Sequence, residues 1–317
     1  MFHNIPYVYE VYKEKSFSKA AKNLYISQPS LSAAIKNIEQ KIGAPIFDRS
    51  TSPLRLTEIG KLYMETAMKI MDQEEAFLEE MQNNNTLQKG TLSVGANHIT
   101  ASFVLPDIIQ KYSALYPNIH ISVVEAGASQ LKSYLKEDKL DLVIDNIENE
   151  DISFFSEYFG TETLFLAVAK SKVNSTILES HCLSVRDIIA GKDKESVVPA
   201  LPSFYIAQFP FILLCKGNNT RSYTDYFFQE SNVHPQILME VNQMATAYHI
   251  VASQVGATVV SDTLIKSDFV RDEVLFFKLP CKKTERNINI LIRKNRYMTR
   301  ATKKILEIIR ESREVLF

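Results

Sequence analysis

The sequence predicts a multidomain chain of mixed α+β and α/β class: an N-terminal winged helix-turn-helix, a long linker helix, and two Rossmann-like α/β subdomains. Three observations support this. Apolar residues recur at helical spacing through the first sixty positions, interrupted by cap residues. A helical pattern without Gly or Pro then runs from about residue 61 to 83. From residue 91, short apolar runs alternate with helical patterns, which is typical of βαβ units.

Length and composition are those of a globular protein with two or three compact units. The 317 residues are 45% hydrophobic and 23% charged, with a formal net charge of −1. Residues 1–60 are mildly basic, with eight Lys and Arg against five Asp and Glu. The sequence has no apolar run of about 18 residues and no signal-peptide pattern, and its 3 cysteines are widely separated. We therefore expect a cytoplasmic protein with no membrane partner.

The chain begins with two short helical patterns. The first apolar face consists of Ile5, Val8, Tyr9 and Tyr12. The second pattern, with Ser18 as its expected N-cap, carries Ala20, Ala21 and Leu24. Adjacent alanines let another helix cross closely, as a helix-turn-helix requires.

A third helix is predicted from Ser27 to Gly43. Ser27 is a good N-cap, Pro29 falls in the first turn, and Gly43 ends the helix. The residues expected to face the core are Leu31, Ala34 or Ile35, Ile38 and Ile42. The opposite face is short and polar, with Gln28, Ser30, Ser32, Ala33, Lys36 and Asn37. Such a face fits a DNA major groove about 12 Å wide, although the solvated face of a small bundle helix would look the same.

The segment "PIFDRSTSPLRLTEIG" follows this helix. Arg49 and Arg55 flank a Ser-Thr-Ser-Pro turn. A hairpin of this kind beside a recognition helix is a wing whose arginines can reach phosphates or the minor groove. The alternative is a loop with two solvated arginines.

The linker helix is predicted from Glu58 to about Asn83. An apolar stripe recurs every three or four residues: Leu62, Tyr63, Ala67, Ile70, Met71, Phe77 or Leu78, and Met81. About 24 residues at about 1.5 Å each span about 36 Å, too long for the preceding sixty residues to cover. We expect an antiparallel partner helix from a second copy, the alternative being packing against its own domain. The segment 83–90, "NNNTLQKG", is the expected hinge.

The remaining two-thirds of the chain predicts two α/β units linked by two crossovers. Subdomain I is expected to contain residues 91–163 and 268–317, and subdomain II residues 164–267, each around a parallel, doubly wound sheet. The resulting domains are 1–58 (helix-turn-helix), 59–90 (linker helix and hinge) and 91–317. In such a fold a ligand binds at the carboxyl ends of the strands, near helix N-termini.

Polar residues at those strand ends are the candidate effector-binding residues. They are Asn97, His98 and Thr100 after the first strand, Ser129 after the second, and Asn219, Thr220, Arg221 and Gln243 in the second unit. Each alone is equally well explained as a helix cap. Arg221 can bind a carboxylate or phosphate, or pair with Asp225 four residues on in its own helix.

The sequence gives less support to metal binding, redox sensing or catalysis. His98 has no second His at metal-ligand spacing, so no metal site is expected. Cys215 falls on an apolar strand and fits a buried core thiol, while Cys182 and Cys281 have no close cysteine in sequence, which leaves redox sensing as a minor alternative. No Gly-rich phosphate loop, nucleophile elbow or Cys/His cluster occurs, so we expect neither an enzyme nor a cofactor.

Residues 1–60 resemble the winged helix-turn-helix of LysR-type transcriptional regulators. The matching residues are Phe17, Ala20, Ala21, Leu24, Ser27, Gln28, Pro29, Ser30, Leu31, Ser32, Ile35, Ile38, Glu39, Gly43, Phe47, Arg49, Leu54, Thr57 and Gly60. The later pattern resembles the type 2 periplasmic-binding-protein-like effector domain of the same family, so the resemblance covers the whole chain. Ala33 departs from the family, which often has a longer polar or basic residue there.

The resemblance implies a function and partners. The DNA-binding residues would be Ser27, Gln28, Pro29, Ser30, Ser32, Ala33, Lys36, Arg49 and Arg55. The target would be a pseudo-palindromic promoter site in double-stranded DNA. The protein would be a homodimer through the 59–83 helix, commonly a homotetramer, and would act with RNA polymerase. A small organic anion bound between the two subdomains would control the protein allosterically.

Two other classes compete with a regulator. A solute-binding protein of transport shares the cleft fold, but the absent signal peptide and the helix-turn-helix argue against it. An enzyme is the third class, and it would turn over a metabolite without binding DNA.

Overall fold

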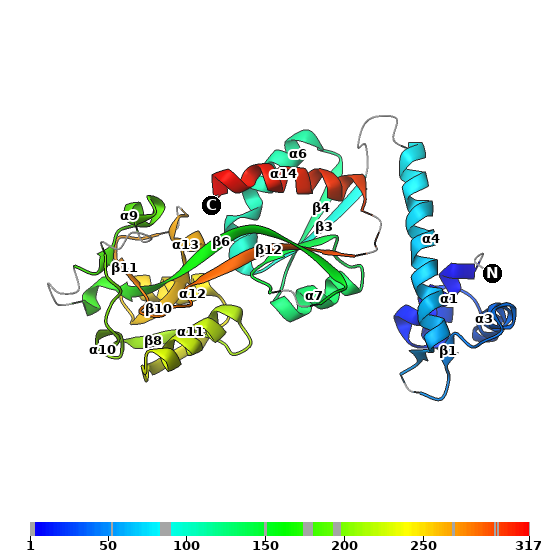
Figure 1. Cartoon of the computed structure of the whole chain (residues 1–317), viewed down its shortest axis with the longest axis horizontal. Helices are drawn as coiled ribbons and strands as arrows, with labels where there is room; N and C mark the ends of the chain where they lie inside the picture. Colours follow the sequence, from blue (N-terminus) through cyan, green and yellow to red (C-terminus); the bar gives the residue numbers. More distant parts are fainter. Residues whose placement is uncertain are drawn as a thin grey trace. The chain divides into compact units, whose positions relative to one another are not determined.

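The computed structural model describes residues 4–51, 53–82, 90–148, 151–173, 180–192, 198–267, 270–294, 296 and 298–316. The chain forms two compact units. Unit 1 is Met1–Thr86 with Asn295–Thr299, and unit 2 is Leu87–Lys294 with Arg300–Phe317. The linker helix therefore belongs to unit 1 (Figure 1). The predicted hinge lies outside the described residues except for Gly90, which begins the first strand of unit 2.

Unit 1 is a winged helix-turn-helix extended by a long helix. Its elements are α1 (Ile5–Glu14), α2 (Phe17–Asn23), α3 (Gln28–Ile42), β1 (Phe47–Asp48), β2 (Arg55–Leu56) and α4 (Glu58–Gln82). The two short strands pair antiparallel, with Phe47 opposite Leu56, and form the wing that the sequence predicts. Ser27 is the N-cap of α3, and Gly43 ends it in the left-handed conformation at φ +81°, both as predicted.

Two details of the predicted helices in unit 1 are wrong. The N-cap of α2 is Ser16, not Ser18, because the extended Ser16 accepts a hydrogen bond from the Lys19 N–H at 3.4 Å. On α1 the buried residues include Val11, whereas Tyr12 is 37% exposed. The tyrosines border the apolar face and the aliphatic residues occupy its centre.

Helix α4 has two apolar faces. Tyr63, Met64 and Ala67 are buried against unit 1 itself, so the predicted stripe partly covers its own domain. A second set stays exposed: Ile59 at 42%, Leu62 at 61%, Ile70 at 37% and Phe77 at 60%. Packing against unit 1 therefore accounts for one side of the helix only.

Unit 2 contains the alternating strands and helices predicted from residue 91 onward. The strands are β3 (Gly90–Ala96), β4 (Ile119–Glu125), β5 (Leu142–Asp145), β6 (Phe154–Ala169), β7 (Cys182–Leu183), β8 (Pro210–Leu214), β9 (Gln236–Val241), β10 (Ala257–Ser261), β11 (Val274–Lys278) and β12 (Glu285–Arg293). The helices are α5 (His98–Phe103), α6 (Leu105–Leu115), α7 (Ala128–Lys136), α9 (Val185–Ile189), α10 (Ser203–Ile206), α11 (Asn219–Glu230), α12 (Met244–Ala252), α13 (Asp262–Ile265) and α14 (Arg300–Leu316), with a 3-10 turn at Lys170–Lys172.

The sheets are mixed rather than purely parallel. The strand order is β4-β3-β5-β12-β6-β10-β8-β9. The pairs among β3, β4 and β5 are parallel, as are β10–β8 and β8–β9, but β6 and β12 run antiparallel to their neighbours. Strand β6 is 16 residues long and joins both sheets (Figure 1). The first half of β6 is rich in polar residues, so an apolar run in the sequence marks only the second half.

The predicted return to subdomain I at residue 268 is too early. Strand β11 pairs with β6 and β7 in the sheet of subdomain II. The return is made by β12, which pairs with the first half of β6 and with β5. An apolar run fits either sheet equally well, so only the strand pairing assigns β11.

The helical pattern of residues 102–116, which the sequence predicts as a single helix ending before Pro117, is divided between two helices. Helix α5 already begins at His98, and α6 begins at Leu105, with Pro106 in its first turn. Proline lacks the N–H that would continue a preceding helix. The break brings the start of α5 to the end of β3. None of the described helices is both long and apolar enough to cross a membrane.

Candidate functional sites

The N-terminal half of α3 presents small polar side chains to solvent. Ser27 and Ser30 share a hydrogen bond of 2.7 Å between their hydroxyls, and the Ser30 N–H donates to Ser27 Oγ at 3.2 Å. The Gln28 amide donates to Ser32 Oγ at 3.3 Å. These bonds are local to the helix, so the side chains can exchange them for bonds to a partner.

The predicted DNA-binding residues of α3 lie away from the core of unit 1. Ser27, Gln28, Pro29, Ser30, Ala33 and Lys36 are exposed, and Ser32 is half-buried. The opposite face is fixed by Leu31, Ile35 and Ile38, all buried. Burial on one side thus determines which residues face outward.

The two wing arginines differ. Arg49 Nη2 lies 3.1 Å from Glu39 Oε2, and its guanidinium lies 5.2 Å from the centre of the Phe17 ring. The same Glu39 also accepts the Ile46 N–H at 2.8 Å, which links α3 to the wing. Arg49 therefore helps to hold the wing, while its side chain remains 49% exposed. Arg55 is exposed on β2.

Unit 2 contains a cavity of about 220 Å³ between its two sheets. The starts of α5, α7, α11 and α12 all contribute to its wall, together with the ends of β4 and β5 and a residue of β12. Residues of both subdomains thus line one space. This is where the fold is expected to bind a ligand, at strand ends and helix N-termini.

Five of the eight predicted effector-binding residues line the cavity, namely Asn97, His98, Asn219, Thr220 and Gln243. The other three do not. The Thr100 side chain is buried, and its N–H donates to Asn97 Oδ1 at 2.9 Å, so it belongs to the capping of α5. Ser129 is exposed outside the cavity lining, because the turn of α7 directs Gly127 and Ala128 inward instead.

Arg221 has a structural role. Its Nε lies 2.8 Å from Asp225 Oδ1, the i,i+4 pair left open by the sequence, and its Nη1 donates to the Leu214 carbonyl at 2.7 Å and pairs with Glu240. The guanidinium joins α11 to β8 and β9. With its side chain 6% exposed and these bonds in place, Arg221 is not part of the cavity wall.

The sequence did not identify three other lining residues as candidates. Asp145 is the last residue of β5 and Asn146 follows it, so the rule that ligands bind at strand ends points to both, but in sequence they only close an apolar run. Arg286 lies on β12, far along the chain, and its position depends on the antiparallel pairing with β6. No local pattern marks it.

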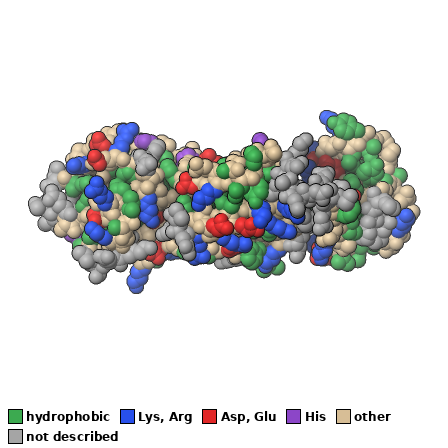
Figure 2. Space-filling view, turned by 90° about the horizontal axis from the view of Figure 1, so that it is seen from above, with side chains coloured by type: hydrophobic (Ala, Val, Ile, Leu, Met, Phe, Trp, Pro, Cys, Tyr) green, Lys and Arg blue, Asp and Glu red, His purple; other side chains and the backbone are tan. Residues whose placement is uncertain are grey.

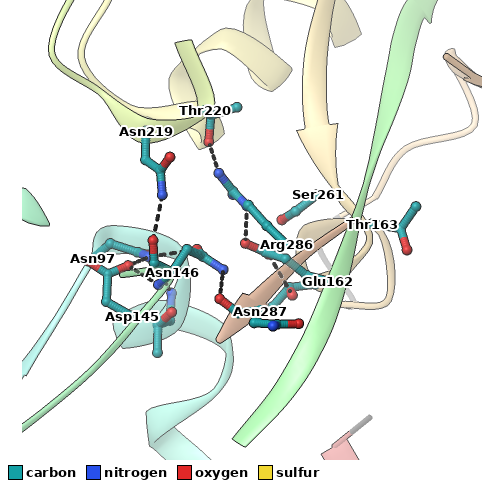
Figure 3. Close-up of polar contacts among 12 residues, drawn as sticks. Asn97, Asp145, Asn146, Glu162, Thr163, Asn219, Thr220, Ser261, Arg286 and Asn287 are labelled. Carbon is teal, nitrogen blue, oxygen red and sulfur yellow. Dashed lines mark hydrogen bonds and ion pairs between the residues drawn. The ribbon is translucent and has the colours of Figure 1, made fainter. Parts of the chain in front are cut away.

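Arg286 is the centre of a buried polar network (Figure 3). Its Nε donates to Glu162 Oε1 at 2.6 Å and its Nη1 to Thr220 Oγ1 at 2.8 Å. The other oxygen of Glu162 accepts the Thr263 hydroxyl at 3.1 Å. Arg286 and Glu162 are 5% and 2% exposed, so each neutralises a charge that would be costly to bury alone.

A hydrogen bond crosses the cavity between the two subdomains. Asn219 Nδ2, at the start of α11, donates to the Asn146 carbonyl at 2.6 Å, as Figure 3 shows. Asn97 in turn donates to Asn146 Oδ1 at 3.3 Å and to Asp145. The bond from Asn219 is the direct polar link from α11 to the end of β5, and a ligand can compete for it.

Asp145 is a buried carboxylate, 4% exposed, on the floor of the cavity. Burial raises its pKa to about 6, although hydrogen bonds from Asn97 and the Asn146 N–H and the nearby Arg286 charge lower it. Asp145 therefore changes its charge close to neutral pH. No cation lies within ion-pair distance of it among the described residues.

The remaining charged groups are paired or lie outside the cavity. His98 Nδ1 lies 2.9 Å from Glu125 Oε2 at its rim. None of the three cysteines forms a disulfide within the described residues. Burial raises the pKa of Cys281, which disfavours a reactive thiolate there. Among the described residues, no group of His, Cys, Asp and Glu could hold a metal ion. Figure 2 shows acidic and basic side chains mixed over the face that it draws. On the surface of unit 2, Arg310 and Glu157 form an ion pair at 2.7 Å.

Comparison with known proteins identifies both domains of the chain. Residues 2–61 match the bacterial regulatory helix-turn-helix profile of the lysR family, and residues 85–174 and 205–314 match the LysR substrate binding domain. An uncharacterized HTH-type transcriptional regulator of Bacillus subtilis, YcgK, is 28% identical over 311 residues, covering 98% of this chain and 94% of its own.

Two solved structures share the fold. A full-length OxyR variant from Pseudomonas aeruginosa aligns with a TM-score of 0.64 and 20% identity, covering 98% of this chain and 94% of its own. The effector binding domain of QuiR in complex with shikimate aligns with a TM-score of 0.56 and 17% identity, covering 72% of this chain and 99% of its own. These relatives are transcriptional regulators and not enzymes. The chain belongs to the LysR family of transcriptional regulators, with a helix-turn-helix for DNA and a domain for a small-molecule effector.

Proposed function

We propose that this regulator binds a pseudo-palindromic promoter site as a homodimer, with α3 in the major groove. The supporting observation is the polar row at the start of α3, formed by the exposed Gln28 and Ser30 and the half-buried Ser32. Within the described residues, their side chains bond to each other or to Ser27. Lys36 and Arg55 would contact phosphates, as would Arg49 with the exposed part of its side chain.

The second copy would pack on α4. The exposed Ile59, Leu62, Ile70 and Phe77 lie on the side of α4 that unit 1 does not cover. An antiparallel α4 from another protomer would bury them and place two copies of α3 on two half-sites. We extend the proposal to assembly of dimers into a tetramer, to contact with RNA polymerase, and to action in the cytoplasm.

The effector would be a small organic acid held in the cavity of unit 2. Asn97, His98, Asn219, Thr220 and Gln243 would contact it, because they line the space between the subdomains. Binding there would replace the Asn219–Asn146 hydrogen bond and change how the subdomains meet. This change would alter the arrangement of the protomers and thereby the spacing of the α3 helices.

The test is a selection of genomic DNA fragments by the purified full-length protein, followed by footprinting. We expect protection of two half-sites about one helical turn apart or a multiple of it. Adding small organic acids should change the footprint or the affinity. Turnover of a metabolite without any selective DNA binding would refute the proposal.

A further inference from the structure

Each cation in the described lining of the cavity is already paired with a carboxylate. Of the described residues in its lining, only Arg286 and His98 carry or can gain positive charge. Arg286 uses Nε and Nη1 for Glu162 and Thr220, and His98 pairs with Glu125. Because both charges are already balanced, backbone N–H groups are the further source of attraction for an anion.

Those N–H groups are provided by two helix starts. Helices α7 and α12 have N-caps Gly127 and Gln243, and neither cap makes a side-chain hydrogen bond to its helix. Gly127, Ala128, Gln243 and Met244 all line the cavity. The free N–H groups and the positive end of the helix dipole at each start favour a negative group.

One buried acceptor in the cavity remains unused. Both hydrogen bonds to Asp145 within the described residues go to Oδ1, from the Asn97 amide and from the Asn146 N–H at 2.7 Å. Oδ2 accepts no hydrogen bond from the described residues. It is not fully buried, and Asp145 lines the cavity, so we infer that Oδ2 faces the cavity. A buried carboxylate oxygen of this kind is costly unless a donor reaches it.

Two polar side chains at the start of α12 add further hydrogen-bonding partners for a ligand. Asn242 and Gln243 are exposed, line the cavity, and make no side-chain hydrogen bond within the described part of the chain. Their amides can accept as well as donate. The cavity thus combines helix starts that attract an anion with a buried carboxylate oxygen, Oδ2 of Asp145, that lacks a hydrogen-bond donor within the described residues.

We propose that the effector is a small carboxylate that also carries a hydroxyl or ammonium group, which donates a hydrogen bond to Oδ2 of Asp145. This inference rests on the proposed effector function and narrows its ligand class. The carboxylate lies at the starts of α7 and α12, and the donor points to the end of β5. A cavity of about 220 Å³ is smaller than the sites that take drug-sized ligands, so the ligand is a small metabolite.

Matched ligand pairs test the inference on the full-length protein at pH 7.5. The probes are propionate against lactate and alanine, cyclohexanecarboxylate against quinate, and benzoate against 3-hydroxybenzoate. We expect at least one donor-bearing probe to bind about tenfold or more tighter than its donor-free partner by calorimetry, because a hydrogen bond to a charged group is strong.

Asp145→Asn should remove that preference. With Oδ1 still accepting from Asn97 and Asn146, the new amide nitrogen takes the place of Oδ2 and presents a donor instead of an acceptor. Asp107→Asn is the matched control, because Asp107 is exposed in the first turn of α6 and outside the cavity. It should keep the wild-type preference.

The inference is wrong if no donor-bearing probe binds wild-type protein more tightly than its partner, or if Asp145→Asn folds and keeps the preference. Should Asp145→Asn fail to fold, the comparison of ligand pairs on wild-type protein still decides. Donor-free carboxylates that bind equally well would end this inference and leave the proposed function standing. Failure of the proposed function would appear separately, as loss of selective DNA binding.

Discussion

The exposed start of α3 and the cavity of unit 2 both present uncharged polar side chains, yet they are assembled in opposite ways. On α3, Ser27, Gln28, Ser30 and Ser32 lie within one helical turn and a half, and their hydrogen bonds connect neighbours in sequence. In the cavity, Asn146 and Asn219 meet although 73 residues separate them, and Arg286 reaches Thr220 from 66 residues away.

The difference teaches which interactions can be changed without harm to folding. Apart from the N-cap Ser27, these α3 side chains bond only locally within the described residues, so their substitution should affect DNA binding more than stability. The cavity side chains also hold two subdomains together, so their substitution should affect stability and binding at once. Four experiments test this distinction.

The largest effect is expected for the buried ion pair. Glu162→Ala leaves the guanidinium of Arg286 buried without its partner and should lower the free energy of unfolding of unit 2 by about 3–5 kcal/mol. Denaturant unfolding of the full-length protein measures this. The control is Glu65→Ala on α4, whose partner Lys69 is 57% exposed, and it should change stability by less than about 1 kcal/mol. Equal losses of unfolding free energy in the two variants would mean that the Arg286–Glu162 pair stabilises the fold no more than a surface ion pair does.

The next effect is a pH dependence from Asp145. Its pKa of about 6 in the folded chain lies above the ordinary 3.8, so the folded state binds the proton more tightly. The resulting stabilisation is full below the unfolded pKa and is lost as the pH rises through 6. A shift of about two units corresponds to about 3 kcal/mol. Between pH 4 and pH 7, wild type should lose about this much stability relative to Asp145→Asn; a pH-independent difference between them would contradict the assignment.

The third effect is on DNA binding alone. Gln28→Ala and Ser32→Ala should each weaken specific binding by about 1–3 kcal/mol, or about 5- to 150-fold, if the side chains contact bases. Melting temperatures should stay within a degree or two, because both side chains bond only to each other. If both variants gave the wild-type footprint, α3 would not be the helix that recognises the DNA sequence.

The smallest effect separates two residues that the sequence treats alike. Asn219→Ala should weaken effector binding about tenfold, since it removes an amide at the cavity wall. Ser129→Ala should leave binding within about twofold, because Ser129 lies outside the lining. Effector titration of DNA affinity compares the two, and a loss of response with Ser129→Ala would place the ligand elsewhere.

Local patterns in the sequence determined unit 1 well. The Ser27 cap, the Gly43 terminus, the buried face of α3 and the extent of α4 all follow from helix periodicity and capping, which act over a few residues. The error at Ser16 is of the same kind, because nearby serines offer equally good caps. Strand-end loops likewise predicted five residues of the cavity wall.

Only the tertiary structure decided the rest. Strand pairing between distant segments decides which sheet receives β11, and that β12 pairs antiparallel with β6, the strand that runs through both sheets. That pairing brings Arg286 beside Glu162, turns Arg221 away into its own ion pairs, and leaves one oxygen of Asp145 open to the cavity. Periodicity records which side of an element is buried, but it holds no information about which distant element buries it. The sequence by itself therefore determined the family, the helices of unit 1 and the outward face of α3, whereas the chemistry of the cavity was decided by contacts made only on folding.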